Sequence, residues 1–147
     1  MRVTLTVTVV LCRLALSSQA DDKTSCADAS RTQYELNACT GDAFKKVDAE
    51  LNARYQQILR EYADDPAFIG KLKASQRAWI KFQDAELAAL FPHDDEPRYS
   101  GSVYPMCLNQ WQTILAKQRI EQLGKWLDKT GEGDVCSGSI KVEAGYN

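Results

Sequence analysis

Residues 26–39 read CADASRTQYELNAC, a polar stretch with a cysteine at each end. Within it, Thr32 and Glu35 have the spacing of a capping box, in which each side chain accepts a hydrogen bond from the backbone amide of the other residue. Beyond the box, apolar residues recur mostly every three or four positions as far as Tyr62. This period is that of one face of a helix. We therefore predict a long amphipathic helix that begins at Thr32.

Two further segments have the same periodicity. Asp64-Asp65-Pro66 is predicted to end the first helix and to begin a second over about 66–90, with Asp65 as N-cap and Pro66 in the first turn. A third helix is predicted over about 104–129. The apolar positions that define the three faces are Leu36, Phe44, Val47, Leu51, Tyr55, Ile58, Tyr62, Ile69, Leu72, Trp79, Phe82, Leu87, Leu90, Cys107, Trp111, Ile114, Leu115, Leu123, Trp126 and Leu127.

No segment alternates with period two for long enough to predict a strand. The expected fold is all-α: a small helical bundle or hairpin of about three long helices, stapled by disulfides.

The ends of the chain differ in character from its middle. Residues 1–20 have the basic start, short apolar run and small residues of a signal peptide, and the apolar run is too short to span a membrane. Residues 21–130 are predicted to form the helical domain. The glycine-rich tail 131–147 needs an attachment to be ordered, and Cys136 is the candidate. A signal peptide implies export, so we expect a periplasmic or secreted protein of a bacterial envelope.

Export also determines how the cysteines are interpreted. Cys12 leaves with the leader, and the remaining four allow three disulfide pairings. We favour Cys26–Cys39 and Cys107–Cys136, since each pair joins a helix to a neighbouring irregular segment. A zinc site is the alternative, but the chain has no close cysteine pair and a single histidine.

The charge excludes some partners and leaves others open. Residues 1–20 contain two arginines and no acidic residue, so the rest of the chain has 16 basic and 20 acidic side chains, a net charge of −4. This balance argues against nucleic acid, which requires a basic surface, and is compatible with a basic protein. His93 lies in an acidic loop without a nucleophile motif nearby. We therefore expect no catalysis, metal or cofactor.

Three polar residues lie among apolar positions of the predicted helices: Gln76, Arg77 and Arg119. One interpretation is a buried polar network that fixes the register of the helices. The other is a binding role.

The chain resembles the LprI-like lysozyme-inhibitor family over residues 26 to about 127, nearly the whole predicted domain. The matching elements, in order, are Cys26, Thr32-Gln33-x-Glu35-Leu36-Asn37-x-Cys39, Asp48-Ala49-Glu50-Leu51-Asn52-x-x-Tyr55, Leu72-x-x-x-Gln76-Arg77-Ala78-Trp79-Ile80-x-Phe82-x-Asp84-Ala85, Gly101-Ser102 and Arg119-x-x-x-Leu123.

The chain departs from the family pattern at one expected disulfide. Leu87 and Trp111 stand where the family usually has two cysteines, and Gln83 replaces a motif arginine. Because both cysteines are absent together, we expect an apolar contact in their place, with Trp79 nearby. A Cys107–Cys136 disulfide would then replace the missing one.

The resemblance implies a protein that binds and inhibits lysozyme, a basic enzyme with carboxylates in its cleft. A loop over about 92–104 could enter that cleft. Its expected contributions are attraction by Asp94, Asp95 and Glu96 and contact by Tyr99, Ser102 and Tyr104. The alternative function is an envelope interaction module, such as a chaperone, adaptor or immunity-type protein, with a partner other than lysozyme.

Overall fold

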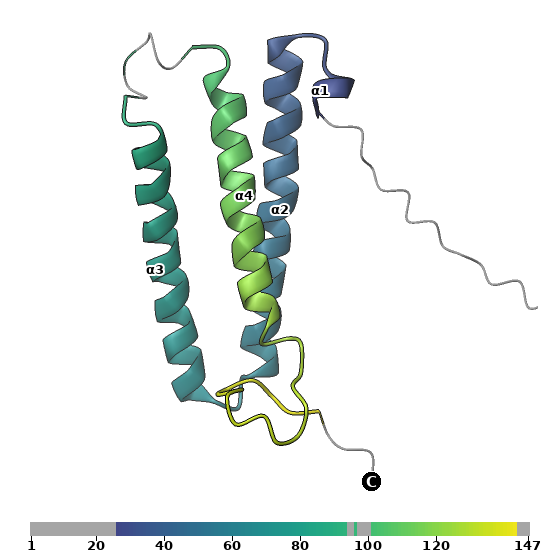
Figure 1. Cartoon of the computed structure of the whole chain (residues 1–147), viewed down its shortest axis with the longest axis vertical. Helices are drawn as coiled ribbons and strands as arrows, with labels where there is room; N and C mark the ends of the chain where they lie inside the picture. Colours follow the sequence, from purple (N-terminus) through teal and green to yellow (C-terminus); the bar gives the residue numbers. More distant parts are fainter. Residues whose placement is uncertain (1–25, 94–95, 97–100, 144–147) are drawn as a thin grey trace, which may run out of the picture.

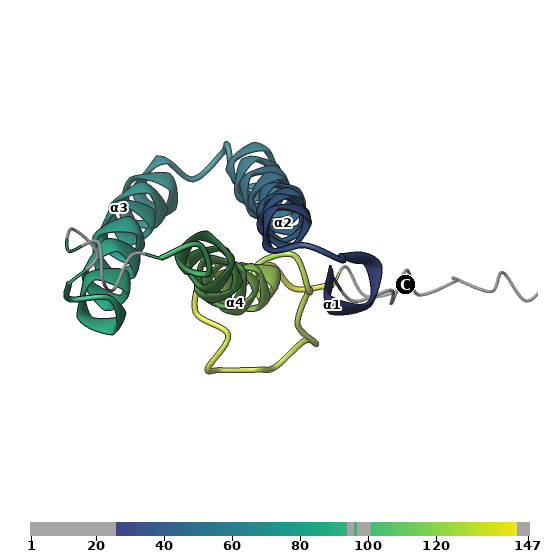
Figure 2. The same ribbon diagram turned by 90° about the horizontal axis from the view of Figure 1, so that it is seen from above.

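The computed structural model describes residues 26–93, 96 and 101–143. It contains a short helix α1 (Cys26–Ala29) and three long ones, α2 (Gln33–Glu61), α3 (Pro66–Leu90) and α4 (Tyr104–Gly124). The chain passes along α2, returns along α3 and passes again along α4, so α2 and α4 run parallel and α3 antiparallel (Figure 1). Seen from above, the long helices form a triangle (Figure 2). The all-α prediction is confirmed.

The first long helix begins where the capping box predicts. The Glu35 amide donates to the Thr32 hydroxyl over 3.2 Å, and the Thr32 amide donates to the Glu35 carboxylate over 3.0 Å. The Arg31 amide donates to the same carboxylate over 2.8 Å. These backbone donors, Arg31 first, lower the pKa of Glu35 below its usual range. The helix then continues through Gly41 without interruption.

The α2–α3 turn also follows the sequence prediction. The Asp65 carboxylate accepts a hydrogen bond from the Phe68 amide over 2.9 Å, and Pro66 occupies the first turn, where no backbone donor is required. Helix α3 ends at Leu90, as predicted for the second long helix.

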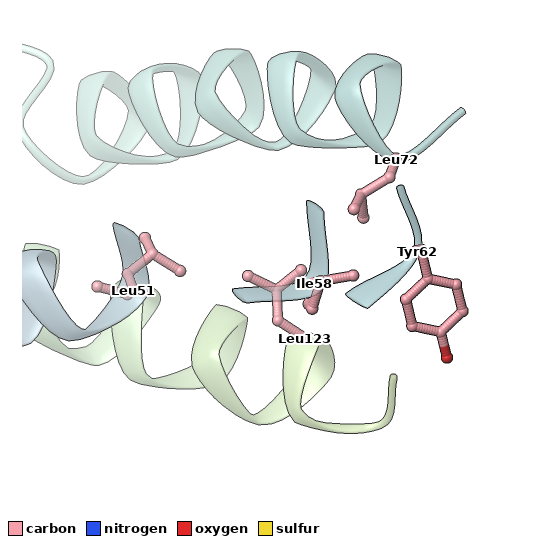
Figure 3. Close-up of a cluster of buried hydrophobic side chains, with 6 residues drawn as sticks. Leu51, Ile58, Tyr62, Leu72 and Leu123 are labelled. Carbon is pink, nitrogen blue, oxygen red and sulfur yellow. The ribbon is translucent and has the colours of Figure 1, made fainter. Parts of the chain in front are cut away.

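The core lies between α2 and α4, with a contribution from the first half of α3 (Figure 3). Ile58 and Leu123 have no exposed surface, and the other members of the cluster are buried almost as completely. Those members are Leu51, Tyr62, Leu72 and Ala116. The second half of α3 is less covered, since the side chains of Ile80 and Phe82 are exposed.

Two expectations for the third long helix are wrong. The helix ends at Gly124 and not near 129, because the Trp126 and Leu127 amides donate to carbonyls three residues back and form a turn. Trp111 is not a core residue: it is 40% exposed. Leu123 faces the core. At roughly 100° per residue, Trp111 lies about 120° around the helix from Leu123.

One of the two predicted disulfides is present. Cys26 and Cys39 are bonded and attach α1 to the first turns of α2. Cys107 and Cys136 are both free thiols, so the second pairing is wrong. Cys107 lies in the first turn of α4 and Cys136 lies beyond its end, and the helix between them holds the two residues apart.

The tail is held by hydrogen bonds and not by Cys136. The Tyr62 hydroxyl donates to the Trp126 carbonyl and accepts from the Lys141 amide, both over 3.0 Å. The Lys141 ammonium donates to the Glu61 carbonyl over 2.6 Å, and the Trp126 indole donates to Ser139. The tail therefore packs on the α2–α3 turn, at the lower end in Figure 1.

Candidate functional site

The connection between α3 and α4, residues 91–103, contains five of the six predicted binding residues, and the sixth, Tyr104, is the first residue of α4. Its two ends meet each other and α2. The rings of Phe91 and Tyr104 pack edge to face with centroids 5.3 Å apart. The Asn37 side-chain amide donates to the Ser102 carbonyl over 2.9 Å. Both ends of the connection are thus attached to the end of the bundle at which α2 begins (Figure 1).

The structure places three of the six predicted loop residues. Ser102 is exposed, and Glu96 and Tyr104 are partly buried. The Glu96 carboxylate lies 3.2 Å from Nδ1 of His93, and the Glu96 amide donates to the His93 carbonyl, which forms a turn. Tyr104 packs on Phe91, so it anchors the connection as well as bordering it. Asp94, Asp95 and Tyr99 lie outside the described residues.

A polar cluster that the sequence analysis did not predict supports this end of the bundle. The Asn109 amide on α4 donates to the Thr40 hydroxyl over 3.3 Å and lies 3.5 Å from the Asn37 carbonyl. The Asn37 side chain in turn holds Ser102. Asn37 and Gly101-Ser102 belong to two separate motifs of the family resemblance, and the structure brings Asn37 and Ser102 into contact. No periodicity in the sequence pairs residues 65 positions apart.

The predicted polar network lies in the middle of the bundle and centres on Arg119, which is 6% exposed. Its guanidinium donates to Gln76 over 3.0 Å, to Gln122 over 3.1 Å and to Ser75 over 3.2 Å. It also lies over the Trp79 ring, 6.0 Å from the centroid. Burial lowers the pKa of Arg119, and Tyr55 opposes this shift. The network joins α4 to α3, which supports the structural interpretation of Gln76 and Arg119.

Arg77 is not part of this network. Its side chain is exposed, and Ser75 occupies the place in the network that the sequence analysis gave to it. Ser75 had no sequence signal of its own, since serine is common at exposed helix positions. Gln76 is thus partly buried and bonded to Arg119, whereas Arg77 is exposed.

The described residues contain no cluster of three or more histidine, cysteine or acidic side chains able to hold a metal ion. Within the same residues, no helix is both long enough and apolar enough to cross a membrane.

Comparison with known proteins gives two matches. A family model described as "Lysozyme inhibitor LprI" matches residues 26–123, from the first residue of α1 to the last turn of α4. An uncharacterized protein of Rhizobium meliloti (strain 1021) is 30% identical over 135 residues, which cover 83% of this chain and 92% of that protein. No solved structure matches the chain.

Proposed function

Because the chain belongs to the LprI lysozyme-inhibitor family, we propose that it is an exported protein that binds a lysozyme non-covalently and inhibits it. The match over residues 26–123 carries this proposal, since it includes all but the last residue of the four helices. The residues that carry the resemblance form the helix cap, the disulfide, the Asn37–Ser102 contact and the Arg119 network. These features build the scaffold, so the inhibitory contacts belong to a surface that the scaffold presents.

We assign that surface to the connection between α3 and α4. Its acidic residues Asp94, Asp95 and Glu96 would attract a basic enzyme, and an acidic mature chain would add long-range attraction. Tyr99, Ser102 and Tyr104 would make the contacts. The attachments at Ser102 and Tyr104 hold the ends of the connection before binding, which lowers the entropy that binding must offset.

The test is a lysis assay in which the purified protein is titrated into a lysozyme acting on a bacterial cell suspension. Lysozymes of several structural classes are assayed in parallel, since the family name does not specify the class. We expect inhibition that saturates at a fixed stoichiometry and is reversed by dilution, as for non-covalent binding. Isothermal titration calorimetry on the same pair measures binding without catalysis.

The control is an unrelated protein of similar net charge, which supplies the charge but lacks the surface. Equal inhibition by this control would identify non-specific charge effects. If no lysozyme class is bound or inhibited, the proposal fails, and an envelope interaction module with another partner becomes the better hypothesis.

A further inference from the structure

A second surface lies away from the α3–α4 connection. A groove of about 470 Å³ is lined by side chains of α2 and α3. Its α3 wall extends from Lys73 to Ile80, two helical turns or about 10 Å. An extended peptide advances about 3.3 Å per residue, so the groove accommodates about three residues of such a chain.

The α3 wall carries two cations, and none of the described acidic residues forms an ion pair with either. Lys73 and Arg77 are both exposed and lie four positions apart, where like charges on a helix repel. Neither has an ion pair or a hydrogen bond to any described residue. The described residues that line the groove include no aspartate or glutamate. A carboxylate bound here would relieve this repulsion.

The Arg119 network orients a further donor toward the groove. The Gln76 side-chain oxygen accepts from Arg119, so the amide N–H groups are its remaining hydrogen-bonding groups. Among the described side chains, no buried nitrogen or oxygen lacks a hydrogen-bond partner, so the Gln76 nitrogen reaches solvent, and Gln76 is one of the residues that line the groove. Across the groove, the Asn52 amide donates to Asp48, which leaves the Asn52 oxygen as an acceptor.

We propose that the α2–α3 groove binds an acidic peptide segment. Arg77 and Lys73 would bind its carboxylates, the first in the bidentate geometry of a guanidinium. The Gln76 donor and the Asn52 acceptor match the two kinds of backbone group, N–H and C=O, that a peptide presents. The apolar atoms of Leu59 and Ile80 contact its side-chain stems. A peptide satisfies all three features together, whereas inorganic phosphate supplies charge and acceptor oxygens but no side-chain stems to contact Leu59 and Ile80.

This site is separate from the proposed lysozyme surface. Arg77 and Phe91 are 14 positions apart, or about 21 Å along α3. The proposal goes beyond lysozyme inhibition and does not depend on it. Lysozyme inhibition measured on the groove variants tests the proposed function separately, because these substitutions leave the connection unchanged.

The test is a titration of the ¹⁵N-labelled protein with hexaglutamate, followed by the side-chain amide signals of Asn52, Gln56 and Gln76. We expect these signals to shift saturably. The double variant K73Q/R77Q should bind hexaglutamate at least tenfold more weakly. The matched control K117Q/K125Q removes two exposed cations from α4 and its end, and it should bind as the unaltered protein does. Thermal unfolding checks that each variant is folded.

Three results would overturn the proposal. The first is the absence of saturable shifts in the groove amides. The second is equal weakening in both double variants, which would indicate general charge attraction. The third is binding of inorganic phosphate at the same amides as tightly as hexaglutamate, which would leave the peptide groups without a role.

Discussion

At the scale of single residues, Arg119 shows how one buried cation is made compatible with an apolar core. Its guanidinium has three side-chain acceptors and an aromatic ring, and none of these is acidic. The dipoles of these polar side chains therefore stabilise the charge, and each of the three acceptor oxygens accepts a hydrogen bond from the guanidinium. Removing the arginine would leave Gln76 and Ser75 without their donor.

We predict that Arg119→Ala lowers the free energy of unfolding by about 3 kcal/mol, since it removes charge-assisted hydrogen bonds and leaves a cavity. Arg77→Ala, at an exposed position next to Gln76, is the matched control. It should change the free energy of unfolding by less than about 0.5 kcal/mol. Urea unfolding measures both. Equal losses would show that Arg77 shares the structural role.

Glu35 is expected to make stability depend on pH. Its folded-state pKa is lowered, so its contribution is present above the unfolded pKa of about 4.3 and is lost as pH falls through the folded value. Glu35→Gln keeps a side chain that can complete a capping box but removes the charge. We predict a lower melting temperature than that of the unaltered protein at pH 7.

The difference should disappear well below pH 4, where Glu35 itself is protonated. Glu121→Gln, on the exposed surface of α4, is the control for a change in net charge. A difference between Glu35→Gln and the unaltered protein that stays constant down to pH 2 would mean that the carboxylate charge does not stabilise the cap.

At the scale of elements, the length of α4 and the attachment of the tail to the α2–α3 turn together determine which cysteines can pair. From Cys107 to the helix end at Gly124 the helix advances about 26 Å, whereas disulfide-bonded residues have Cα atoms roughly 4–7 Å apart. We predict that unreduced peptide mapping finds Cys26 linked to Cys39 and finds both Cys107 and Cys136 alkylated. The exposed Cys136 should react faster than the partly buried Cys107.

A Cys107–Cys136 link would show that the tail leaves the α2–α3 turn or that the end of α4 unfolds. Replacing both Cys26 and Cys39 by serine should lower stability by about 3 kcal/mol, the chain-entropy value for a loop of this length. Replacing both free cysteines by serine is the control and should leave the fold intact.

The tail depends on one hydroxyl group. Tyr62→Phe keeps the buried ring, which packs on Phe68 with centroids 4.4 Å apart, but removes the hydrogen bonds to Trp126 and Lys141. We predict a loss of about 1 kcal/mol. Residues 131–143 should also be cleaved faster in limited proteolysis followed by mass spectrometry. Tyr34→Phe, at an 82% exposed tyrosine, is the control. Unchanged cleavage would mean that the Lys141 ammonium and the Trp126–Ser139 hydrogen bond hold the tail without the hydroxyl.

At the scale of the whole molecule, the proposed lysozyme surface and the tail lie at opposite ends of the bundle (Figure 1). The α2–α3 groove lies along its side. The scaffold thus separates three surfaces, so a substitution in one leaves the others available as internal controls.

We predict that the triple variant D94N/D95N/E96Q associates with an inhibited lysozyme roughly three- to tenfold more slowly. Its association rate should depend less on salt, because charges at the rim of an interface act mainly on the association rate. Tyr99→Ala should instead speed dissociation, since aromatic anchors contribute most of the binding energy. Stopped-flow or surface plasmon resonance separates the two rates.

The control E86Q/E121Q/D128N removes three exposed acidic groups outside the connection. If both triple variants associate equally slowly, net charge and not the connection steers the encounter. If the loop variants leave both rates unchanged while the fold is intact, the assignment of the connection fails.

The sequence by itself determined the start of α2, the turn before α3, both ends of α3 and the Cys26–Cys39 bond. Each depends on groups close together in the chain, such as a hydroxyl and an amide three residues apart, or a proline in a first turn. Local chemistry decides such features wherever the helix is placed.

Only the tertiary structure decided the exposure of Trp111, the separation of Cys107 from Cys136, the Asn37–Ser102 contact and the division of Gln76 from Arg77. These depend on which side of α4 faces α2 and on the register between helices. Side-chain packing across the core sets both quantities. A period of three or four identifies a face of a helix, but it does not identify what that face contacts.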